Sequence, residues 1–121
     1  MENKIEQKPT ITIDDFHKLD IKIGHILSAE KIEGADKLLK LSVDMGEEKP
    51  RQIVSGISMY FPEPEKLVGK KCAFAANLEP RVIRGLESQG MILAVSGGEG
   101  ESIYFSLLET GGDVFPGSSV K

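Results

Sequence analysis

The chain has 121 residues, of which 40% are hydrophobic and 28% charged, and its formal net charge is −4. This length suits one domain that buries about two-thirds of its unfolded surface, and the apolar fraction excludes a fully disordered chain. No apolar run approaches the roughly 20 residues that a membrane span needs, and no secretory signal is expected at the N-terminus. The single cysteine, Cys72, cannot form an internal disulfide, so we expect a cytoplasmic protein with this thiol in its core.

The negative net charge disfavours a nucleic-acid partner, because strong nucleic-acid binders usually carry an excess of basic residues. The charge is unevenly distributed, however. Residues 49–94 hold seven Lys or Arg against four Asp or Glu, a local excess of three positive charges. Charges separated by more than a Debye length of about 8 Å are largely screened. We therefore expect that a basic patch in this part of the chain can bind phosphate with modest, salt-sensitive affinity.

The N-terminal segment precedes the folded domain. Residues 1–10 are polar and are expected to form a flexible tail or the end of a linker from a larger enzyme, with one domain over residues 11–121. Thr12 can cap a short helix, whose acidic first turn suits the positive end of the helix dipole. Phe16 lies on the apolar face of that helix.

Alternating apolar and polar residues predict short strands along the rest of the domain. In one of them the alternation points Leu39, Leu41 and Val43 toward the core. Gly24 interrupts an earlier strand and is expected to mark a bulge or a sharp bend at a barrel corner. The expected strands span residues 20–32, 38–44, 51–56, 70–76 and 91–96, with turns at 34–36 and 45–50 and a short helix at 64–69.

Five short strands with one helix between the third and the fourth are the pattern of an all-β OB-fold, a partly open five-stranded Greek-key barrel that binds oligonucleotides on one face. The Gly-rich segment 96–101 is not a phosphate loop, because it lacks the GK[ST] ending and joins two strands. His17 and His25 have no Cys or carboxylate at metal-ligand spacing. We therefore expect no catalytic set, no metal and no cofactor in this chain.

Residues 77–91, NLEPRVIRGLESQGM, form a long connection between two expected strands. The segment carries two guanidinium groups, two side-chain amides and a hydroxyl. These groups suit a phosphodiester backbone and unpaired bases, since Arg binds phosphate while amides and hydroxyls bind base edges or 2′-hydroxyls. The alternative is a solvated hairpin with two surface arginines, and the residues alone leave both interpretations open.

The order of these residues resembles the tRNA-binding domain family. That family includes the C-terminal domain of bacterial methionyl-tRNA synthetases, stand-alone structure-specific tRNA-binding proteins, and the C-terminal module of the eukaryotic synthetase-associated cytokine precursor. The resemblance covers roughly residues 11–121. It is carried by ITIDDFHKLDIKIGHI (11–26), EGADKLLKL (33–41), RQIVSGI (51–57), LVGKK (67–71), ANL (76–78) and RGLESQGM (84–91).

The resemblance implies a function and a partner. The domain would bind tRNA by shape with little sequence preference, either as the C-terminal tRNA-binding and dimerisation module of a methionyl-tRNA synthetase or as a stand-alone protein. It would not be an enzyme by itself, because the aminoacylation site would lie in a part of the synthetase that is absent here. The rival hypothesis is a protein-binding OB module, chaperone-like or cytokine-like. RGLESQGM is more similar to the tRNA binders than to the chaperone branch.

Nine candidate tRNA-binding residues follow from the sequence and the resemblance. Lys37 is locally an ordinary surface lysine, and the resemblance implies that it faces nucleic acid. Met91 could shape the contact loop or could be the first core residue of the last strand. Glu79 and Val82 stand where family members often carry lysines, and only Arg81 restores a positive charge. The nine candidates are Lys37, Arg51, Ser55, Asn77, Arg81, Arg84, Ser88, Gln89 and Met91.

The segment IYFSLLE, residues 103–109, predicts a homodimer because it is apolar on both faces. One face can cover the barrel, whereas the other would remain as an exposed patch of the kind that interfaces use. The N-terminal helix could supply the matching surface, and the resemblance implies pairing through these regions. The expected interface residues are Phe16, Ile103, Tyr104, Phe105, Leu107 and Leu108.

Overall fold

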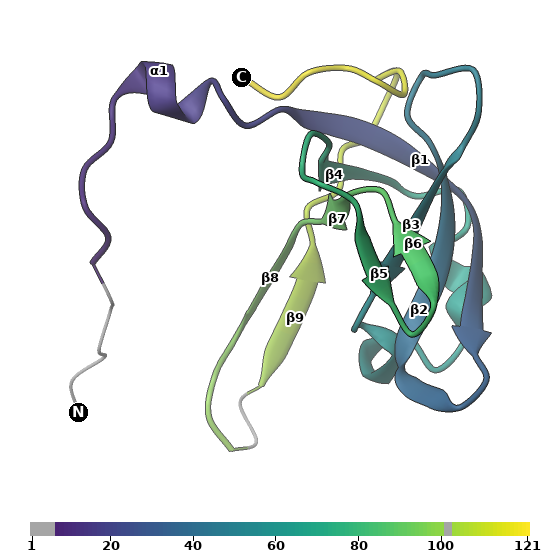
Figure 1. The fold of residues 1–121 in the computed structure, drawn as a ribbon. Helices are drawn as coiled ribbons and strands as arrows, with labels where there is room; N and C mark the ends of the chain where they lie inside the picture. Colours follow the sequence, from purple (N-terminus) through teal and green to yellow (C-terminus); the bar gives the residue numbers. More distant parts are fainter. Residues whose placement is uncertain (1–6, 101–102) are drawn as a thin grey trace.

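The computed structural model describes residues 7–100 and 103–121, and its main body is a small antiparallel β-barrel (Figure 1). Five strands lie in the order β3-β2-β1-β4-β7. The predicted all-β barrel is confirmed, but two short 3₁₀ helices, η1 and η2, connect β3 to β4 where the sequence predicted one short helix at residues 64–69. The elements are β1 Ile21–Ile32, β2 Ala35–Asp44, β3 Arg51–Ser55, η1 Ser58–Tyr60, η2 Pro64–Leu67, β4 Lys71–Ala75 and β7 Met91–Ile92.

The barrel closes where β3 meets the chain just before β7. The backbone N–H of Gln89 donates to the carbonyl of Gln52 at 2.8 Å, and the N–H of Gln52 donates to Oε1 of Gln89 at 2.9 Å. Leu39, Leu41 and Val43 on β2 are fully buried inside the barrel, as their alternation predicts. Cys72 is buried in the same core. Burial raises the pKa of its thiol to about 11, so the thiol is neutral at physiological pH.

The structure requires a glycine at position 24 for a different reason from the bulge or bend that the sequence suggests. β1 continues through it, and the two irregularities in the pairing of β1 with β2 lie between Ile26 and Ser28 and between Lys31 and Ile32. A Cβ atom at Gly24 would lie 2.5 Å from Cγ1 of Val43 and 2.8 Å from Cε1 of Phe74. The glycine is therefore required by close packing inside the barrel, and the predicted bulge lies after it.

The predicted strand 91–96 is two strands. β7 ends at Ile92, and the chain then leaves the barrel to form β8 (Ala94–Gly97), which pairs with β9 (Tyr104–Leu107) in a separate hairpin (Figure 1). The predicted turn at 34–36 is also displaced. It consists of Glu33 and Gly34, because Ile32 already pairs with Ala35.

The N-terminal helix α1, Ile13–Phe16, is confirmed together with its cap, since Oγ1 of Thr12 accepts a hydrogen bond from the N–H of Asp15 at 3.1 Å. None of the residues of α1 is buried, and the helix stands away from the barrel (Figure 1). The tail predicted over residues 1–10 lies outside the described residues except for 7–10, which are exposed. Within residues 7–100 and 103–121, no helix has the length and apolar character of a membrane span.

Candidate nucleic-acid interface

Residues 77–91, predicted as a long loop, contain a β-hairpin. β5 (Arg81–Ile83) pairs with β6 (Leu86–Ser88). The turn between them is Arg84–Gly85, in which both residues have a positive φ, 54° and 79°. Two-residue hairpin turns favour this conformation because its twist matches that of the strands, but the first position usually holds Asn, Asp or Gly. The alternative of a hairpin with two surface arginines is therefore the local structure.

Ser88 anchors the hairpin to the barrel and does not face solvent. Its side chain is only 4% exposed. Its Oγ accepts a hydrogen bond from the N–H of Val54 at 2.9 Å and donates to the carbonyl of Gly90 at 3.0 Å. The expectation that Ser88 lies at the RNA surface is corrected by this burial, because an RNA cannot reach the hydroxyl without displacing the hairpin from β3.

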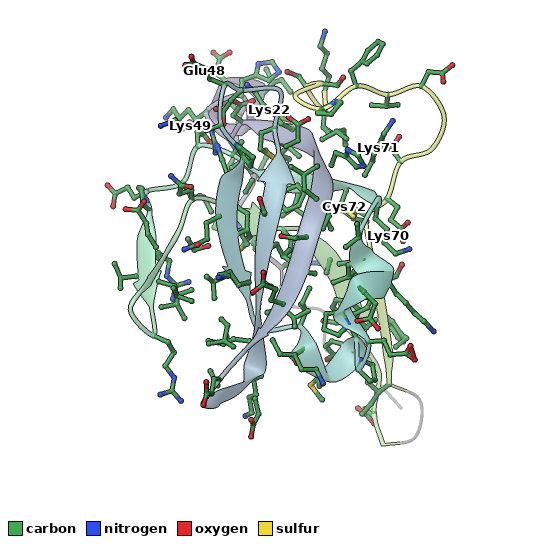
Figure 2. The ribbon with its side chains drawn as sticks, turned by 90° about the vertical axis from the view of Figure 1, so that its right-hand side faces the viewer. Lys22, Glu48, Lys49, Lys70, Lys71 and Cys72 are labelled. Atoms are coloured by element: carbon green, nitrogen blue, oxygen red, sulfur yellow. The ribbon has the colours of Figure 1, made fainter. Side chains whose placement is uncertain are left out.

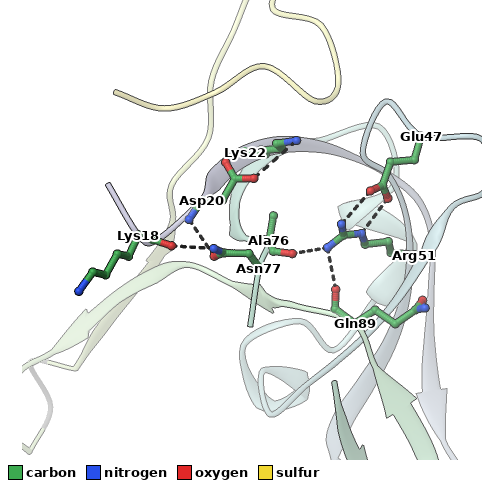
Figure 3. Close-up of polar contacts among 8 residues, drawn as sticks. All are labelled: Lys18, Asp20, Lys22, Glu47, Arg51, Ala76, Asn77 and Gln89. Carbon is green, nitrogen blue, oxygen red and sulfur yellow. Dashed lines mark hydrogen bonds and ion pairs between the residues drawn. The ribbon is translucent and has the colours of Figure 1, made fainter. Parts of the chain in front are cut away.

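Arg51 is also committed to contacts inside the chain (Figure 3). Its Nε and Nη2 donate to the carboxylate of Glu47 at 2.7 and 2.8 Å. Its Nη1 donates to the carbonyl of Ala76 at 2.5 Å and to that of Gln89 at 3.1 Å. The hydrogen bond with Arg51 holds the pKa of Glu47 below its ordinary value, and the same bond raises the pKa of Arg51. Arg51 thus ties together the β2–β3 connection, the end of β4 and the segment before β7.

Asn77 and Gln89 also hold separate segments of the chain together (Figure 3). The side-chain oxygen of Asn77 accepts from the N–H of Asp20 at 2.8 Å, and its Nδ2 donates to the carbonyl of Lys18 at 2.6 Å. Both ends of this amide are used to fasten the N-terminal segment to the end of β4. Gln89 closes the barrel against Gln52 in the way described above.

The remaining candidates lie at or near the surface. Lys37, Arg81, Arg84 and Met91 are exposed, and Ser55 at the end of β3 is half-buried. Met91 is 48% exposed whereas its neighbour Ile92 is buried, so Ile92 and not Met91 is the first core residue of that strand. The exposed residues lie on the hairpin, on β7 beside it and on β2.

Arg84 connects two turns that are distant in sequence. Its Nη2 donates to the carbonyl of Gly34 at 3.2 Å, which joins the tip of the β5–β6 hairpin to the β1–β2 turn. Lys37 and Arg84 line a shared groove between these turns. Leu38 and Ile83 also line it, and neither is among the nine residues predicted from the sequence. The only sequence signal for them was their position inside, or one residue before, the family-like segments 33–41 and 84–91.

The basic excess of residues 49–94 is not one patch. Figure 2 shows Lys70 and Lys71 on the opposite side of the barrel from the hairpin, which lies at the left edge in green. Nζ of Lys70 is 3.2 Å from Oε1 of Glu109. Lys49 lies on the hairpin's side and lines a second groove with Leu78 and Pro80. The cations that surround the hairpin are therefore Lys37, Lys49, Arg81 and Arg84.

The residues expected at a dimer interface fall into two groups. Leu107 is buried in the core, and the ring of Phe105 stacks on that of Tyr60 with centroids 4.0 Å apart. Both are corrected from interface to packing residues, because their side chains face the barrel. The others remain exposed: Phe16, Ile103, Tyr104 and Leu108. In the part of the chain that the structure describes, no three His, Cys, Asp or Glu side chains are placed to hold a metal ion.

Comparison with known proteins identifies relatives of the whole domain. A family model described as "Putative tRNA binding domain" matches residues 21–119. The methionine–tRNA ligase of Caldanaerobacter subterraneus subsp. tengcongensis is 46% identical over 119 residues, which are 98% of this chain and 18% of the ligase. Across eight such ligases, the chain spans 13% to 18% of their length.

Two solved structures share the fold over nearly the whole chain. The MetRS-related protein of Pyrococcus horikoshii superposes with a TM-score of 0.81 and 38% identity, covering 94% of this chain and 100% of that one. The chaperone CsaA of Bacillus anthracis superposes with a TM-score of 0.76 and 26% identity, covering 93% of this chain and 100% of that one. The sequence is thus more similar to the synthetase-related protein than to the chaperone.

Proposed function

This chain belongs to the tRNA-binding domain family, and from that premise we propose that it binds structured tRNA through the β5–β6 hairpin and the adjoining β1–β2 turn. The observation that carries this proposal is the position of Arg84, an exposed cation at the hairpin tip held against Gly34. Arg81 on the same hairpin and Lys37 beside the turn add two more exposed cations. Guanidinium groups bind phosphate oxygens through paired, charge-assisted hydrogen bonds.

The available side chains favour recognition of the RNA backbone and shape over stacking on aromatic rings. Residues 77–91 and 33–38 contain no aromatic residue. Tyr60 and Phe61, which could have stacked on bases, pack against Phe105 instead. A binding surface without aromatic platforms depends mainly on phosphate charge and backbone geometry. This suits a folded tRNA better than a single-stranded sequence.

We further propose that the domain acts as a tRNA-concentrating module of the cytoplasmic translation apparatus. Its relatives include both methionine–tRNA ligases, of which it spans a small part, and a solved protein related to such ligases, which it covers completely. A module that binds tRNA weakly raises the effective tRNA concentration for a linked enzyme without new contacts in the active site. In a ligase, the aminoacylation chemistry would belong to the other parts of the chain.

A homodimer is proposed from two exposed apolar surfaces. α1 stands away from the barrel and exposes Ile13 and Phe16, and the β8–β9 hairpin exposes Val95 and Tyr104 (Figure 1). Monomers rarely leave such surfaces without a partner. Two-fold pairing needs only one self-complementary patch, so α1 of one protomer can pack on the β8–β9 hairpin of the other.

The protein-binding alternative rests on the likeness to the chaperone CsaA, which is 26% identical. It is the weaker proposal, because the synthetase-related protein is 38% identical over a similar share of the chain. Binding of tRNA in the absence of any protein ligand separates the two alternatives.

Arg84→Asn is the variant that tests the site most sharply. Asn followed by Gly is the preferred pair for this turn, so the substitution removes the cation while retaining or improving the hairpin. We expect the free energy of tRNA binding to weaken by about 1–3 kcal/mol, with an unfolding temperature equal to or above that of the parent. Fluorescence anisotropy with a labelled tRNA transcript and a thermal melt provide the two measurements.

Lys66→Asn is the matched control. Lys66 is an exposed cation on η2, and the short helices lie on the far side of the barrel from the hairpin (Figure 2, teal at right). This variant should bind tRNA as the parent does. Equal affinities for Arg84→Asn and Lys66→Asn would show that the hairpin tip is not the binding site.

A further inference from the structure

A groove of about 630 Å³ separates the β1–β2 turn from the tip of the β5–β6 hairpin. It is the place where the two turns joined by Arg84 face each other. One wall belongs to the start of β2 and the other to the end of β5. The groove is lined by Gly34, Ala35, Asp36, Lys37, Leu38, Ile83 and Arg84.

The wall formed by β2 is a bulge. Ile32 of β1 pairs with Ala35, but the preceding residue Lys31 pairs with Leu39, so residues 36–38 have no Cα partners on β1. Bulges redirect side chains and are common beside functional sites. Here the bulge places Asp36, Lys37 and Leu38 on the groove.

Arg84 links the opposite wall, at the tip of the β5–β6 hairpin, to the β1–β2 turn. The hydrogen bond from its Nη2 to the carbonyl of Gly34 spans the end of the groove at 3.2 Å. Arg84 is the one non-glycine residue with a positive φ in the described parts of the chain. This conformation is unfavourable for most L-residues and is tolerated best by Gly, Asn and Asp, so the hairpin retains an arginine where Asn would be more stable.

The lining combines three kinds of group that together match one nucleotide. Leu38 and Ile83 are half-buried and offer apolar contact to the faces of a flat ring. Asp36 and the carbonyl of Gly34 can accept hydrogen bonds from the N–H groups of a base, since a carbonyl has two lone pairs. Lys37 and Arg84 are exposed cations that suit the flanking phosphates.

We propose, on the basis of the function proposed above, that this groove receives one unpaired base of the bound tRNA. Unpaired bases of folded RNAs can be turned outward and held by stacking and by hydrogen bonds along their edges. The phosphates on either side of the extruded base bind Lys37 and Arg84. The groove thereby selects folded RNAs with an accessible unpaired nucleotide over uniform duplexes.

Ile83→Ala tests the groove, with Val82→Ala as its matched control. The two residues are neighbours on β5, but Val82 is 74% exposed and does not line the groove. The probes are a tRNA transcript and a fully paired RNA duplex of the same length. Ile83→Ala should lower the affinity for tRNA roughly tenfold, because it removes most of one apolar contact with the base. Its affinity for the duplex and the salt slope for tRNA should not change, because no cation is removed. Val82→Ala should bind both probes as the parent does.

The outcomes separate this inference from the proposed function. A parent protein that fails to bind tRNA at low salt overturns the proposed function and this inference with it. A parent that binds tRNA, together with an Ile83→Ala variant of equal affinity, overturns the groove inference alone.

Probing of the bound tRNA with dimethyl sulfate, which modifies the Watson–Crick edges of A and C, and with a carbodiimide, which modifies those of U and G, keeps the test decisive if Ile83→Ala loosens the hairpin. The parent protein should protect the Watson–Crick edge of one unpaired base, and Val82→Ala should protect the same base. Absence of any protected unpaired base in the parent complex would also overturn the inference.

Discussion

Arg51 and Arg84 have the same side chain and different surroundings. The guanidinium of Arg51 donates four hydrogen bonds within the chain, two of them to Glu47. That of Arg84 donates one, to Gly34, among the residues that the structure describes. Removing Arg51 would therefore disrupt the contacts that hold the segments around the site together, whereas Arg84 retains the free N–H donors that a phosphate needs.

Ser88→Ala should act on stability and not on RNA contacts. The substitution leaves the N–H of Val54 without its acceptor in a buried position, which typically costs about 1–3 kcal/mol of unfolding free energy. Urea denaturation measures this loss, with the exposed Ser96→Ala as the control. A Ser88→Ala variant with full stability and weakened tRNA affinity would contradict the assignment, since it would place the hydroxyl at the RNA.

The residues that could be predicted from the sequence are those whose role needs no distant partner. Lys37, Arg81 and Arg84 lie at the surface, as an unpaired cation next to a turn should. The side chain of Asn77 forms hydrogen bonds with two residues that lie 57 and 59 positions earlier in the chain. That of Ser88 accepts from a residue 34 positions earlier. Such partners depend on how the barrel closes, and no local pattern contains that information. The sequence therefore indicated which residues of this segment lie at the surface but could not identify those that hold the segment against the barrel.

At the scale of elements, the strands with one buried face were predicted well and the others were not. Leu39, Leu41 and Val43 alternate with polar residues, so β2 could be predicted from its period. Residues 91–95 are apolar throughout, and nothing in them marks the break between β7 and β8. That break is set by pairing: the N–H of Leu93 donates to the carbonyl of Ala73 at 3.0 Å, and β8 then pairs with β9.

Gly24→Ala should destabilise the barrel although alanine is compatible with a strand. The new methyl group would lie 2.5 Å from Val43 and 2.6 Å from the sulfur of Met45. Overpacking of this kind typically costs about 1–3 kcal/mol. Chemical denaturation measures the loss, and Gly111→Ala is the control because a Cβ atom there meets nothing within 4 Å. Equal stability of the two variants would show that the barrel interior can accommodate the methyl group.

At the scale of the whole molecule, the barrel carries the proposed RNA site while α1 and the β8–β9 hairpin extend from it (Figure 1). The proposed dimer uses these extensions and leaves the β5–β6 hairpin available. Pairing would place two sets of hairpin cations on one assembly. Two weak sites that engage one RNA together bind more tightly than either alone, which offsets the net charge of −4 on each chain.

Tyr104→Glu should yield monomers. Tyr104 is 58% exposed on β9, and a carboxylate there would be buried without a partner in the proposed interface. Sedimentation at micromolar concentration should give the parent twice the chain mass of 13.2 kDa and the variant a single chain mass. Met59→Glu, a change at an exposed apolar residue of η1, should remain dimeric. A parent that sediments as one chain would exclude the dimer.

The most direct test of tRNA binding by the hairpin surface is a titration of the parent protein with labelled tRNA over a range of salt concentrations. Four cations surround the hairpin: Lys37, Lys49, Arg81 and Arg84. If each neutralises one phosphate, the logarithm of the binding constant should fall against the logarithm of salt concentration with a slope of roughly −3 to −4. Arg84→Asn should make that slope less negative by about 1. Absence of tRNA binding even at low salt would contradict the proposed function.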